Sequence, residues 1–461
     1  MNYYVDMQHD DLNYEYLYGS TYPLMKNAGR AVADAVMKRY PDAKSVCAVV
    51  GTGNNGGDAI VAATILREKY DVKVLVVTEI RSELAKKALS EYGGQVLGME
   101  AIDACMKCDI IIDGIFGVGI SGDPKEPYRT AIERINGSGS HVVSVDIPSG
   151  LGSRYAVKPE MTVTFTMEKY GMNRENSGDI VVADIGIPPD VRKYAGPGDL
   201  LYYPRPDPSS HKGMNGTLAI VAGWEFYGSS VIAALAAERI GLDLIRIYVS
   251  ERNYQIVSGY DPGLIVRPVS AIDDAVAAEI YGNSAMLVGP GMGRSAEAMD
   301  AARKIILESK IPMVVDADAL NVVGEYQGSF QGKTVIITPH KGEFRRISGM
   351  EPTEENAVAF AKKKGLIVVL KGQVDVITDG KDVYYSKGGN PRMTMGGTGD
   401  LLAGLISSFL AKSIDPIRSC LMGTYLNKAI GDAAHAKHGY WYTITDMIGE
   451  IPAVMDKYIK I

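Results

Sequence analysis

The stretch VCAVVGTGNNGGDA (Val46–Ala59) runs from an apolar segment through four glycines into a segment with helical character. The apolar part, Val46–Val50, predicts a buried strand, and Ala59–Glu68 predicts the helix that follows. Glycine accepts positive φ and lets a ligand come close to the main chain. The helix start offers unpaired N–H groups and a partial positive charge, which suit an anion. The stretch therefore predicts a parallel α/β fold with a ligand loop at a strand end.

The glycine spacing is not sufficient to identify a nucleotide site. It matches neither a Walker A motif nor a complete GxGxxG fingerprint. The alternative interpretation is a tight turn in which Asp58 caps the helix.

Short apolar runs alternate with amphipathic segments along the rest of the chain, which is typical of parallel sheets covered on both faces. In the first part, the predicted strands are Val46–Val50, Val72–Val77, Asp109–Asp113 and Val142–Asp146. The predicted helices are Leu24–Tyr40, Ala59–Glu68, Glu83–Tyr92 and Tyr128–Ile135. The pattern is interrupted between Pro188 and Pro208, where closely spaced prolines predict a linker.

The alternation resumes after the prolines. The predicted strands are Thr217–Ala222, Leu244–Val249, Ala285–Val288, Met313–Asp316, Val335–Thr338 and Ile367–Leu370. The predicted helices are Ser229–Ile240, Ala296–Glu308, Thr353–Lys364, Asp400–Leu410 and Pro416–His438. We therefore predict two α/β domains, at residues 1–205 and 206–461.

Composition excludes several classes of protein. The 461 residues carry 48 Lys and Arg against 55 Asp and Glu, a net charge of -7, and no long basic block, which argues against a nucleic-acid partner. No apolar run approaches the roughly 18 residues of a membrane helix. The N-terminus lacks a secretory signal pattern, so we expect a cytoplasmic protein. Several of the 27 tyrosines fall between Tyr3 and Tyr22. They predict an aromatic arm at an interface, and hence a homo-oligomer.

Two further strand ends carry acidic side chains. Asp113 precedes a second glycine-rich loop, and Asp146 precedes a Pro-Ser-Gly turn. In an open parallel sheet, ligands bind beyond the carboxyl ends of the strands. We therefore expect Asn55, Asp113 and Ser149 to converge as oxygen ligands for a cation. The alternative is that each aspartate only caps a helix.

The combined motifs resemble the N-terminal YjeF domain, the family of NAD(P)H-hydrate epimerases with a Rossmann-like three-layer fold. The resemblance covers about residues 10–200 and rests on Met25–Gly29, Gly51–Asp58, Asp113–Gly119, Ser121–Asp123, Glu126–Tyr128 and Val145–Gly150. It implies a potassium ion at Asn55, Asp113 and Ser149, and it implies Asp146 as substrate contact and candidate acid/base. The other implied substrate contacts are Asn54, Asn55, Gly56, Gly57, Asp58, Gly117, Val118, Gly119, Ile120, Ser121, Gly122 and Asp123. Ala59 and Val118 depart from the residues usual in the family.

The implied chemistry suits a carboxylate. Epimerising a hydrated dihydronicotinamide at C6 needs reversible loss and return of hydroxide, or of a proton, at one carbon. A positioned carboxylate contributes about 10²–10⁴-fold as a general acid or base.

A second glycine-rich stretch, Gly389–Asp400, leads into an apolar helix. Its segment Gly396–Gly399 would aim backbone N–H groups at one point, where they stabilise a transferring phosphoryl group. Asp400 follows at once and can take a proton from a substrate hydroxyl, which is the minimal equipment for phosphoryl transfer. The alternative is a glycine-rich loop that Asp400 merely caps.

This region resembles the ribokinase-like superfamily and, within it, the ADP/ATP-dependent NAD(P)H-hydrate dehydratases. The resemblance spans about residues 209–461 and rests on His211–Gly216, Val221–Gly223, Gly289–Gly293, Val315–Asn321, Thr338–Phe344, Lys371–Asp375 and Gly396–Asp400. It implies nucleotide contacts at Lys371, Gly372, Gln373, Val374, Asp375 and Gly399. It implies substrate contacts at Gly291, His340 and Asp400, with Asp400 as catalytic base and Mg²⁺ on the phosphates of ADP or ATP.

The sequence thus predicts a bifunctional enzyme that epimerises hydrated NADH and NADPH and then dehydrates one epimer. One alternative is a ribokinase-like small-molecule kinase with an accessory nucleotide-binding domain. A second is a non-enzymatic first domain that serves as a binding scaffold, as in RNA-decapping proteins of related fold.

Overall fold

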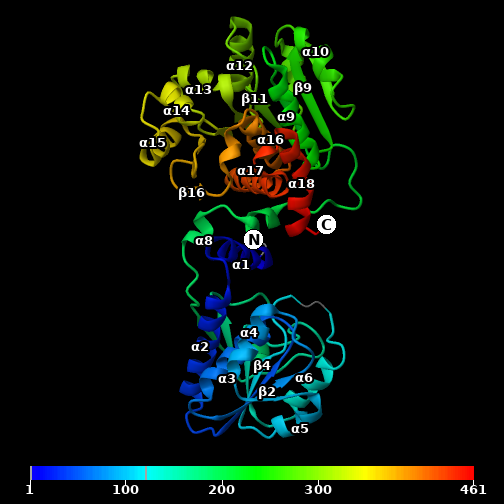
Figure 1. Ribbon diagram of the computed structural model, residues 1–461, viewed down its shortest axis with the longest axis vertical. Helices are drawn as coiled ribbons and strands as arrows, with labels where there is room; N and C mark the ends of the chain where they lie inside the picture. The colour runs from blue at the N-terminus through cyan, green and yellow to red at the C-terminus, as the bar shows by residue number, and fades with distance from the viewer. Residues whose placement is uncertain (1–2, 120–121, 461) are drawn as a thin grey trace. The chain divides into compact units, whose positions relative to one another are not determined.

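A computed structural model describes residues 3–119 and 122–460. The chain forms two compact units, and each is built around its own sheet (Figure 1). One unit holds the chain up to Met7 and Tyr18–Pro188, and the other holds Gln8–Leu17 and the chain from Pro189 onward. The predicted α/β class is confirmed. The compact units do not coincide with the predicted limits of 1–205 and 206–461.

The first unit contains a seven-stranded parallel sheet in the order β3-β2-β1-β4-β5-β6-β7. Its strands are β1 (Ser45–Val50), β2 (Asp71–Val76), β3 (Gln95–Leu97), β4 (Ile110–Gly114), β5 (His141–Val145), β6 (Met161–Phe165) and β7 (Asp179–Ala183). Strands β3, β6 and β7 were not predicted from the sequence. The chain proceeds outward from β1 to β3 and then returns to β4 on the other side of β1. The strand order therefore reverses between β1 and β4, which is where such sheets bind ligands.

Two layers of helices cover this sheet. Figure 1 shows α2 (Tyr22–Arg39), α3 (Asn54–Leu66) and α4 (Glu83–Tyr92) over one face, and α5 (Ile102–Cys105) and α6 (Tyr128–Asn136) over the other. The short helices α7 (Arg174–Ser177) and α8 (Asp190–Lys193) follow later in the chain.

Helix α3 begins five residues earlier than predicted, with Gly53 as its N-cap. Asp58 is therefore a helical residue rather than the cap. The alternative interpretation, in which Asp58 caps the helix, is wrong because Gly56 and Gly57 fit into the first turn. A side chain at Gly56 would lie 2.8 Å from the Gly51 carbonyl oxygen, so only glycine permits this close packing.

The second unit contains a nine-stranded sheet in the order β10-β9-β8-β11-β12-β13-β14-β15-β16. Its strands are β8 (Thr217–Val221), β9 (Leu244–Ser250), β10 (Ile265–Val269), β11 (Ala285–Val288), β12 (Met313–Val315), β13 (Val335–Ile337), β14 (Ile367–Leu370), β15 (Asp375–Thr378) and β16 (Val383–Ser386). The strands are parallel as far as β14, and β15 and β16 are antiparallel to their neighbours. Here the strand order reverses between β8 and β11.

Helices cover both faces of the second sheet (Figure 1). One face carries α9 (Tyr227–Arg239), α10 (Glu251–Ser258), α16 (Thr398–Ala411), α17 (Pro416–His438) and α18 (Ile444–Tyr458). The other carries α11 (Asp274–Tyr281), α12 (Ala296–Glu308), α13 (Leu320–Glu325), α14 (Lys341–Ser348) and α15 (Glu354–Lys364).

The predicted linker between Pro188 and Pro208 is wrong for its middle part. Val191, Ala195 and Leu200 are fully buried, and α8 and a 3₁₀ helix at Pro197–Tyr202 lie within this stretch. Proline is tolerated at the first position of a helix because that residue's N–H would have no helical partner. Pro189 and Pro197 therefore lie at helix starts, and the later prolines lie in the exposed segment 204–209.

The predicted aromatic arm at the N-terminus is also wrong for most of its described tyrosines. Helix α1 (Tyr3–Tyr18) places Tyr14 in a buried position, and the Tyr16 ring packs on Tyr425 with the centroids 5.4 Å apart. Tyr22 is buried at the start of α2. Among the residues that the structure describes, no helix is long and apolar enough to cross a membrane.

Candidate active sites

The cation ligands expected in the first unit lie together at the carboxyl ends of β1, β4 and β5. The Asn55 side-chain amide donates to the Phe116 carbonyl oxygen at 2.9 Å. The Ser149 hydroxyl donates to Asp113 Oδ1 at 2.5 Å, and the Phe116 N–H donates to the Ser149 hydroxyl at 2.8 Å. Asn55, Asp113 and Ser149 therefore lie around the backbone of Phe116.

Asp113 is fully buried and accepts hydrogen bonds from hydroxyl and amide groups. Its donors are the Ser144 hydroxyl, the Ser149 hydroxyl, and the N–H groups of Ser149 and Ile115. Burial raises the pKa of Asp113, and the hydrogen bonds from Ser149 and Ser144 oppose that rise. Within residues 3–119 and 122–460, no lysine or arginine forms an ion pair with this carboxylate. The Asp113 site is thus rich in oxygen and lacks a cationic side chain.

Asp146 lies one residue beyond β5 with its backbone in the left-handed region at φ 63°, which is rare for a residue other than glycine. Its N–H donates to the Val163 carbonyl oxygen on β6 at 2.8 Å, which fixes the backbone. The Asp146 carboxylate forms an ion pair with Lys169, with Nζ 2.5 Å from Oδ1. Both side chains are buried.

The remaining predicted contacts of the first unit follow β1 and β4. Asn54 accepts a hydrogen bond from the Ser82 hydroxyl, and Gly117 lies against the Asn55 side chain. Val118 is half-buried and Gly119 is exposed in the same loop. Asp123 accepts a hydrogen bond from the Arg154 N–H at 3.1 Å, which ties two exposed loops together. Gly122 precedes it, also exposed, whereas Ile120 and Ser121 lie outside the described residues.

In the second unit, charged side chains gather at the carboxyl ends of β12, β13 and β14. The Lys371 ammonium lies 3.0 Å from Asp316 Oδ1 and 4.0 Å from Glu343 Oε2. Burial alone would lower the pKa of Lys371, but Asp316 and Glu343 outweigh it and raise that pKa. Burial raises the pKa of Glu343. Two carboxylates thus share one buried ammonium group.

Asp400 lies in the first turn of α16, directly after Gly399. A side chain at Gly399 would lie 3.3 Å from Lys371 Nζ, so the helix start and the lysine are neighbours. Burial and the negative charge of Asp316 raise the pKa of Asp400 to about 6, although a hydrogen bond from Ser229 and the charge of Lys371 oppose the rise. Asp400 can therefore act as a base near neutral pH, beside N–H groups that have no partner within the helix.

Gly291 and His340 border this region from neighbouring strand ends. Gly291 has φ 64°, and a side chain there would lie 2.0 Å from the Phe226 carbonyl oxygen. The His340 ring accepts hydrogen bonds through Nδ1 from the N–H groups of Gly342 and Glu343, at 3.0 and 3.2 Å. His340 therefore caps α14, and its ring remains mostly exposed.

The predicted nucleotide loop, Lys371–Asp375, connects β14 to β15. Gly372 N–H donates to Asp375 Oδ1 at 2.9 Å. Lys428, on α17, donates to the Gln373 carbonyl oxygen at 3.1 Å and lies 3.2 Å from Asp375 Oδ2. Val374 is exposed at the tip of the loop.

Comparison with known proteins identifies both units. Residues 21–171 match the family model for the YjeF-related protein N-terminus, and residues 218–453 match that for NAD(P)H-hydrate dehydratase. The bifunctional NAD(P)H-hydrate repair enzyme Nnr of Archaeoglobus fulgidus is 36% identical, over 97% of this chain and 97% of its own. The enzyme of the same name from Pyrobaculum aerophilum is also 36% identical, over 98% of both chains.

The chain belongs to the family of bifunctional NAD(P)H-hydrate repair enzymes.

Solved structures agree with this family for the second unit. The ADP/ATP-dependent NAD(P)H-hydrate dehydratase of Bacillus subtilis, co-crystallised with ATP and Mg²⁺, is 26% identical with a TM-score of 0.50. It covers 57% of this chain and 96% of its own. A ribokinase-like superfamily protein from Enterococcus faecalis is 26% identical with a TM-score of 0.52, covering 58% of this chain and 96% of its own. The predicted ribokinase-like fold is confirmed.

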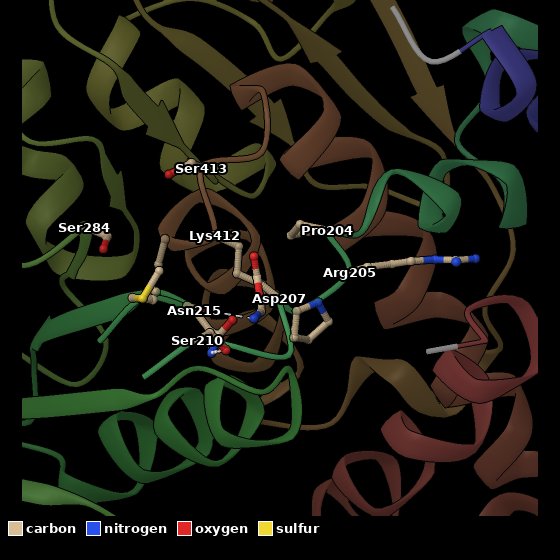
Figure 2. Close-up of a pocket in the computed structure, with 12 residues that line it drawn as sticks. Pro204, Arg205, Asp207, Ser210, Asn215, Ser284, Lys412 and Ser413 are labelled. Atoms are coloured by element: carbon tan, nitrogen blue, oxygen red, sulfur yellow. Dashed lines mark hydrogen bonds between the residues drawn. The ribbon is translucent and has the colours of Figure 1, made fainter. Parts of the chain in front are cut away.

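A separate cavity of the second unit does not belong to this family site. It has a volume of about 220 Å³ and is lined by residues before β8 and β11, by residues 204–207 and by the end of α16 (Figure 2). The cavity therefore lies at the amino ends of the strands, whereas the Asp400 site lies at their carboxyl ends. Its lysine, Lys412, donates to the carbonyl oxygens of Asn215 and Gly241, and none of the predicted site residues lines it.

Four charged residues of the two candidate sites were not assigned a role from the sequence. Lys169 and Lys428 follow no motif, and only their contacts reveal them. Asp316 and Glu343 lie within the motifs Val315–Asn321 and Thr338–Phe344, but those motifs assign them no role. The position of Asp316 directly after β12, and of Glu343 in the first turn of the helix that follows β13, was the signal that could have found them.

Proposed function

We propose that this chain repairs hydrated NADH and NADPH in two reactions. The first unit interconverts the R and S epimers, and the second dehydrates the S epimer with ADP or ATP. The observation that carries the proposal is the Asp400 carboxylate, which has its pKa raised to about 6 and sits beside Lys371 at the start of α16. Membership of the bifunctional family supports both activities on one chain.

Dehydration begins when Asp400 accepts the proton of the C6 hydroxyl group. The C6 oxygen then attacks the terminal phosphorus of the nucleotide, and the nucleotide leaves one phosphate shorter. The N–H groups at the start of α16 stabilise the negative charge on the transferring group. The C6–O bond next breaks, phosphate leaves with the bonding electrons, and loss of a proton from C5 restores the double bond.

A magnesium ion fits the second site by the chemistry of its donors. Magnesium is usually held by one or two carboxylates together with phosphate oxygens and water. Asp316 and Glu343 supply two carboxylates there, and the described part of the chain holds no group of three or more His, Cys, Asp or Glu side chains that could bind a metal ion. Asp316 and Glu343 would hold the ion, which neutralises phosphate charge when bound. Lys371–Asp375 and Gly399 would contact the nucleotide, and Gly291 and His340 the substrate.

For epimerisation, the route proposed here differs from loss of hydroxide or of a proton at C6, because the Asp146 carboxylate can instead accept the proton of the C6 hydroxyl group. Asp146 accepts the proton of the C6 hydroxyl as the C6–N1 bond opens, with its electron pair moving to N1. C6 becomes an aldehyde, and rotation about C5–C6 exposes its other face. N1 then adds to that face, and Asp146 returns the proton, so no atom is gained or lost. The loops Asn54–Asp58 and 117–123 would hold the nucleotide around C6.

A potassium ion fits the Asp113 site for a separate physical reason. A buried carboxylate that lacks a cationic side chain is costly unless another cation accompanies it. Asn55, Asp113 and Ser149 would hold the ion, which balances the Asp113 charge when bound. A cytoplasmic location and a homo-oligomeric assembly, both expected from the sequence, stay predictions.

The decisive experiment supplies the full chain with a mixture of both hydrated NADH epimers and either ADP or ATP. The wild-type protein is expected to convert both epimers to NADH. Asp400→Ala is expected to abolish NADH formation while the epimers still interconvert. Asp146→Asn is expected to consume one epimer at the normal rate and the other only at the spontaneous rate. NADH formation by Asp400→Ala would refute the role of that carboxylate.

A further inference from the structure

Lys169 is a buried charged residue to which neither the sequence motifs nor the proposed reaction assigns a role. It is 4% exposed and lies four residues beyond the end of β6. Its ammonium group reaches across to Asp146, the residue after β5, at a distance of 2.5 Å. The pair therefore joins the ends of two adjacent strands at the candidate epimerase site.

The contacts of Asp146 divide sharply between its two carboxylate oxygens. Lys169 Nζ, the Thr164 hydroxyl and the Phe165 N–H all approach Oδ1, the last two at 3.3 Å. Among residues 3–119 and 122–460, no group donates a hydrogen bond to Oδ2. One oxygen is thus held by protein, and the other is left for a ligand.

The position of the ammonium group is itself fixed by the backbone. Lys169 Nζ also donates to the Phe165 carbonyl oxygen at 2.6 Å. Thr166, between them, adopts φ 67°, and the Met167 N–H donates back to the Phe165 carbonyl oxygen at 2.7 Å. This tight turn returns the lysine over the strand end, and the Phe165 carbonyl oxygen gives its ammonium group a second partner beside Asp146.

We propose that Lys169 is a positioning residue for epimerisation, because it holds Asp146 through Oδ1 and leaves Oδ2 as the oxygen that exchanges the proton of the C6 hydroxyl. The proposal rests on the proposed epimerase function of the first unit. A buried carboxylate without a charged partner would be protonated or would turn toward solvent. Lys169 supplies the charged partner that holds the carboxylate in place, while it transfers no proton itself.

The test compares Lys169→Met, Lys169→Arg and Lys169→Ala in the full chain by measuring kcat and KM for exchange of the two epimers. Lys169→Met is expected to lower kcat about 100-fold while KM changes little, because the nucleotide loops remain intact. Lys169→Arg is expected to retain at least about a tenth of kcat, since the charge remains. Methylammonium added to Lys169→Ala is expected to restore kcat in a saturable manner.

Two controls belong to the same chain. ADP-dependent dehydration by the second unit should stay at the wild-type rate in every Lys169 variant, which shows that the effect of the substitution is confined to the first unit. Lys158→Met removes an exposed lysine of the first unit and should leave epimerisation unchanged.

The outcomes separate this proposal from the function on which it rests. Wild-type kcat in Lys169→Met, or a loss that appears only in KM, would overturn the positioning role while epimerase activity stands. If Lys169→Met fails to fold, the absence of rescue by methylammonium in folded Lys169→Ala would overturn it instead. A wild-type chain that exchanges epimers no faster than buffer would overturn both.

Discussion

At the scale of single residues, the surroundings of Asp400 decide what it can do. An exposed aspartate is a weak base at neutral pH because its pKa lies near 4. Burial and the nearby carboxylate of Asp316 raise the pKa of Asp400 to about 6, and Lys371 limits the rise. The carboxylate is thus more basic than usual and still ionised at neutral pH, as a general base needs to be.

The rate of dehydration should therefore follow the ionisation of Asp400. Because the ionised form accepts the proton, kcat is expected to fall about tenfold for each pH unit below about 6 and to level off above it. The measurement is NADH formation at saturating nucleotide across this range.

Ser229 provides the matched test of this assignment. Its hydrogen bond lowers the pKa of Asp400, so Ser229→Ala should raise that pKa and move the acid limb to higher pH. A limb that stays in place in Ser229→Ala would show that another group titrates.

At the scale of elements, the loop between β14 and β15 depends on a residue far away in sequence. Lys428 on α17 donates to the carbonyl oxygens of Gln373 and Ser386 and pairs with Asp375. The ammonium is buried, so its three oxygen partners stabilise one arrangement of the loop. The shape of the proposed nucleotide loop thus comes from helix packing as well as from its own sequence.

Lys428→Met should loosen this loop and raise KM for ADP or ATP about tenfold or more, because misplaced binding groups weaken contact with the nucleotide. The change in kcat at saturating nucleotide should be smaller, since Asp400 keeps its place. Steady-state kinetics of dehydration measures both. Lys437→Met is the control, because Lys437 lies on the same helix and pairs with Glu450 away from the loop. An equal rise in KM for both variants would contradict the loop assignment.

At the scale of the whole molecule, the second unit includes a segment from the beginning of the chain. The ring of His9 on α1 lies between two carboxylates. His9 Nδ1 is 3.0 Å from Asp10 Oδ1, and His9 Nε2 is 3.3 Å from Asp199 Oδ1. Arg418 pairs with the same Asp199. Burial alone would lower the pKa of His9, but its bonds to Asp10 and Asp199 outweigh that and raise the pKa to about 9. This buried charged cluster fastens α1 to the second unit.

The cluster predicts how the stability of the second unit depends on pH. Because the folded pKa of His9 lies above its unfolded value of 6.5, its contribution is fully present below about pH 6.5 and is lost as pH rises through about 9. The difference in unfolding free energy between wild type and His9→Gln should be on the order of 3 kcal/mol below about pH 6.5 and should shrink toward pH 10.

Tryptophan fluorescence isolates this effect, because both tryptophans, Trp224 and Trp441, lie in the second unit. His141→Gln is the control, since His141 pairs with Glu160 in the first unit and should not alter the fluorescence transition. A difference between wild type and His9→Gln that is constant across this pH range would contradict the assignment.

The sequence by itself determined the two α/β domains, most strands next to the sites, and the residues at their carboxyl ends. Apolar runs, glycines and helix starts are local features, so Asp113, Asp146 and Asp400 could be recognised without the fold. The sequence did not reveal β6 or β7, nor the buried parts of the proline-rich stretch. Only tertiary structure paired Lys169 with Asp146, Lys428 with Asp375 and α1 with the second unit. The physical reason is that a charged residue can be buried only beside a partner. These partners come from separate elements, which only the packing of the folded chain brings together.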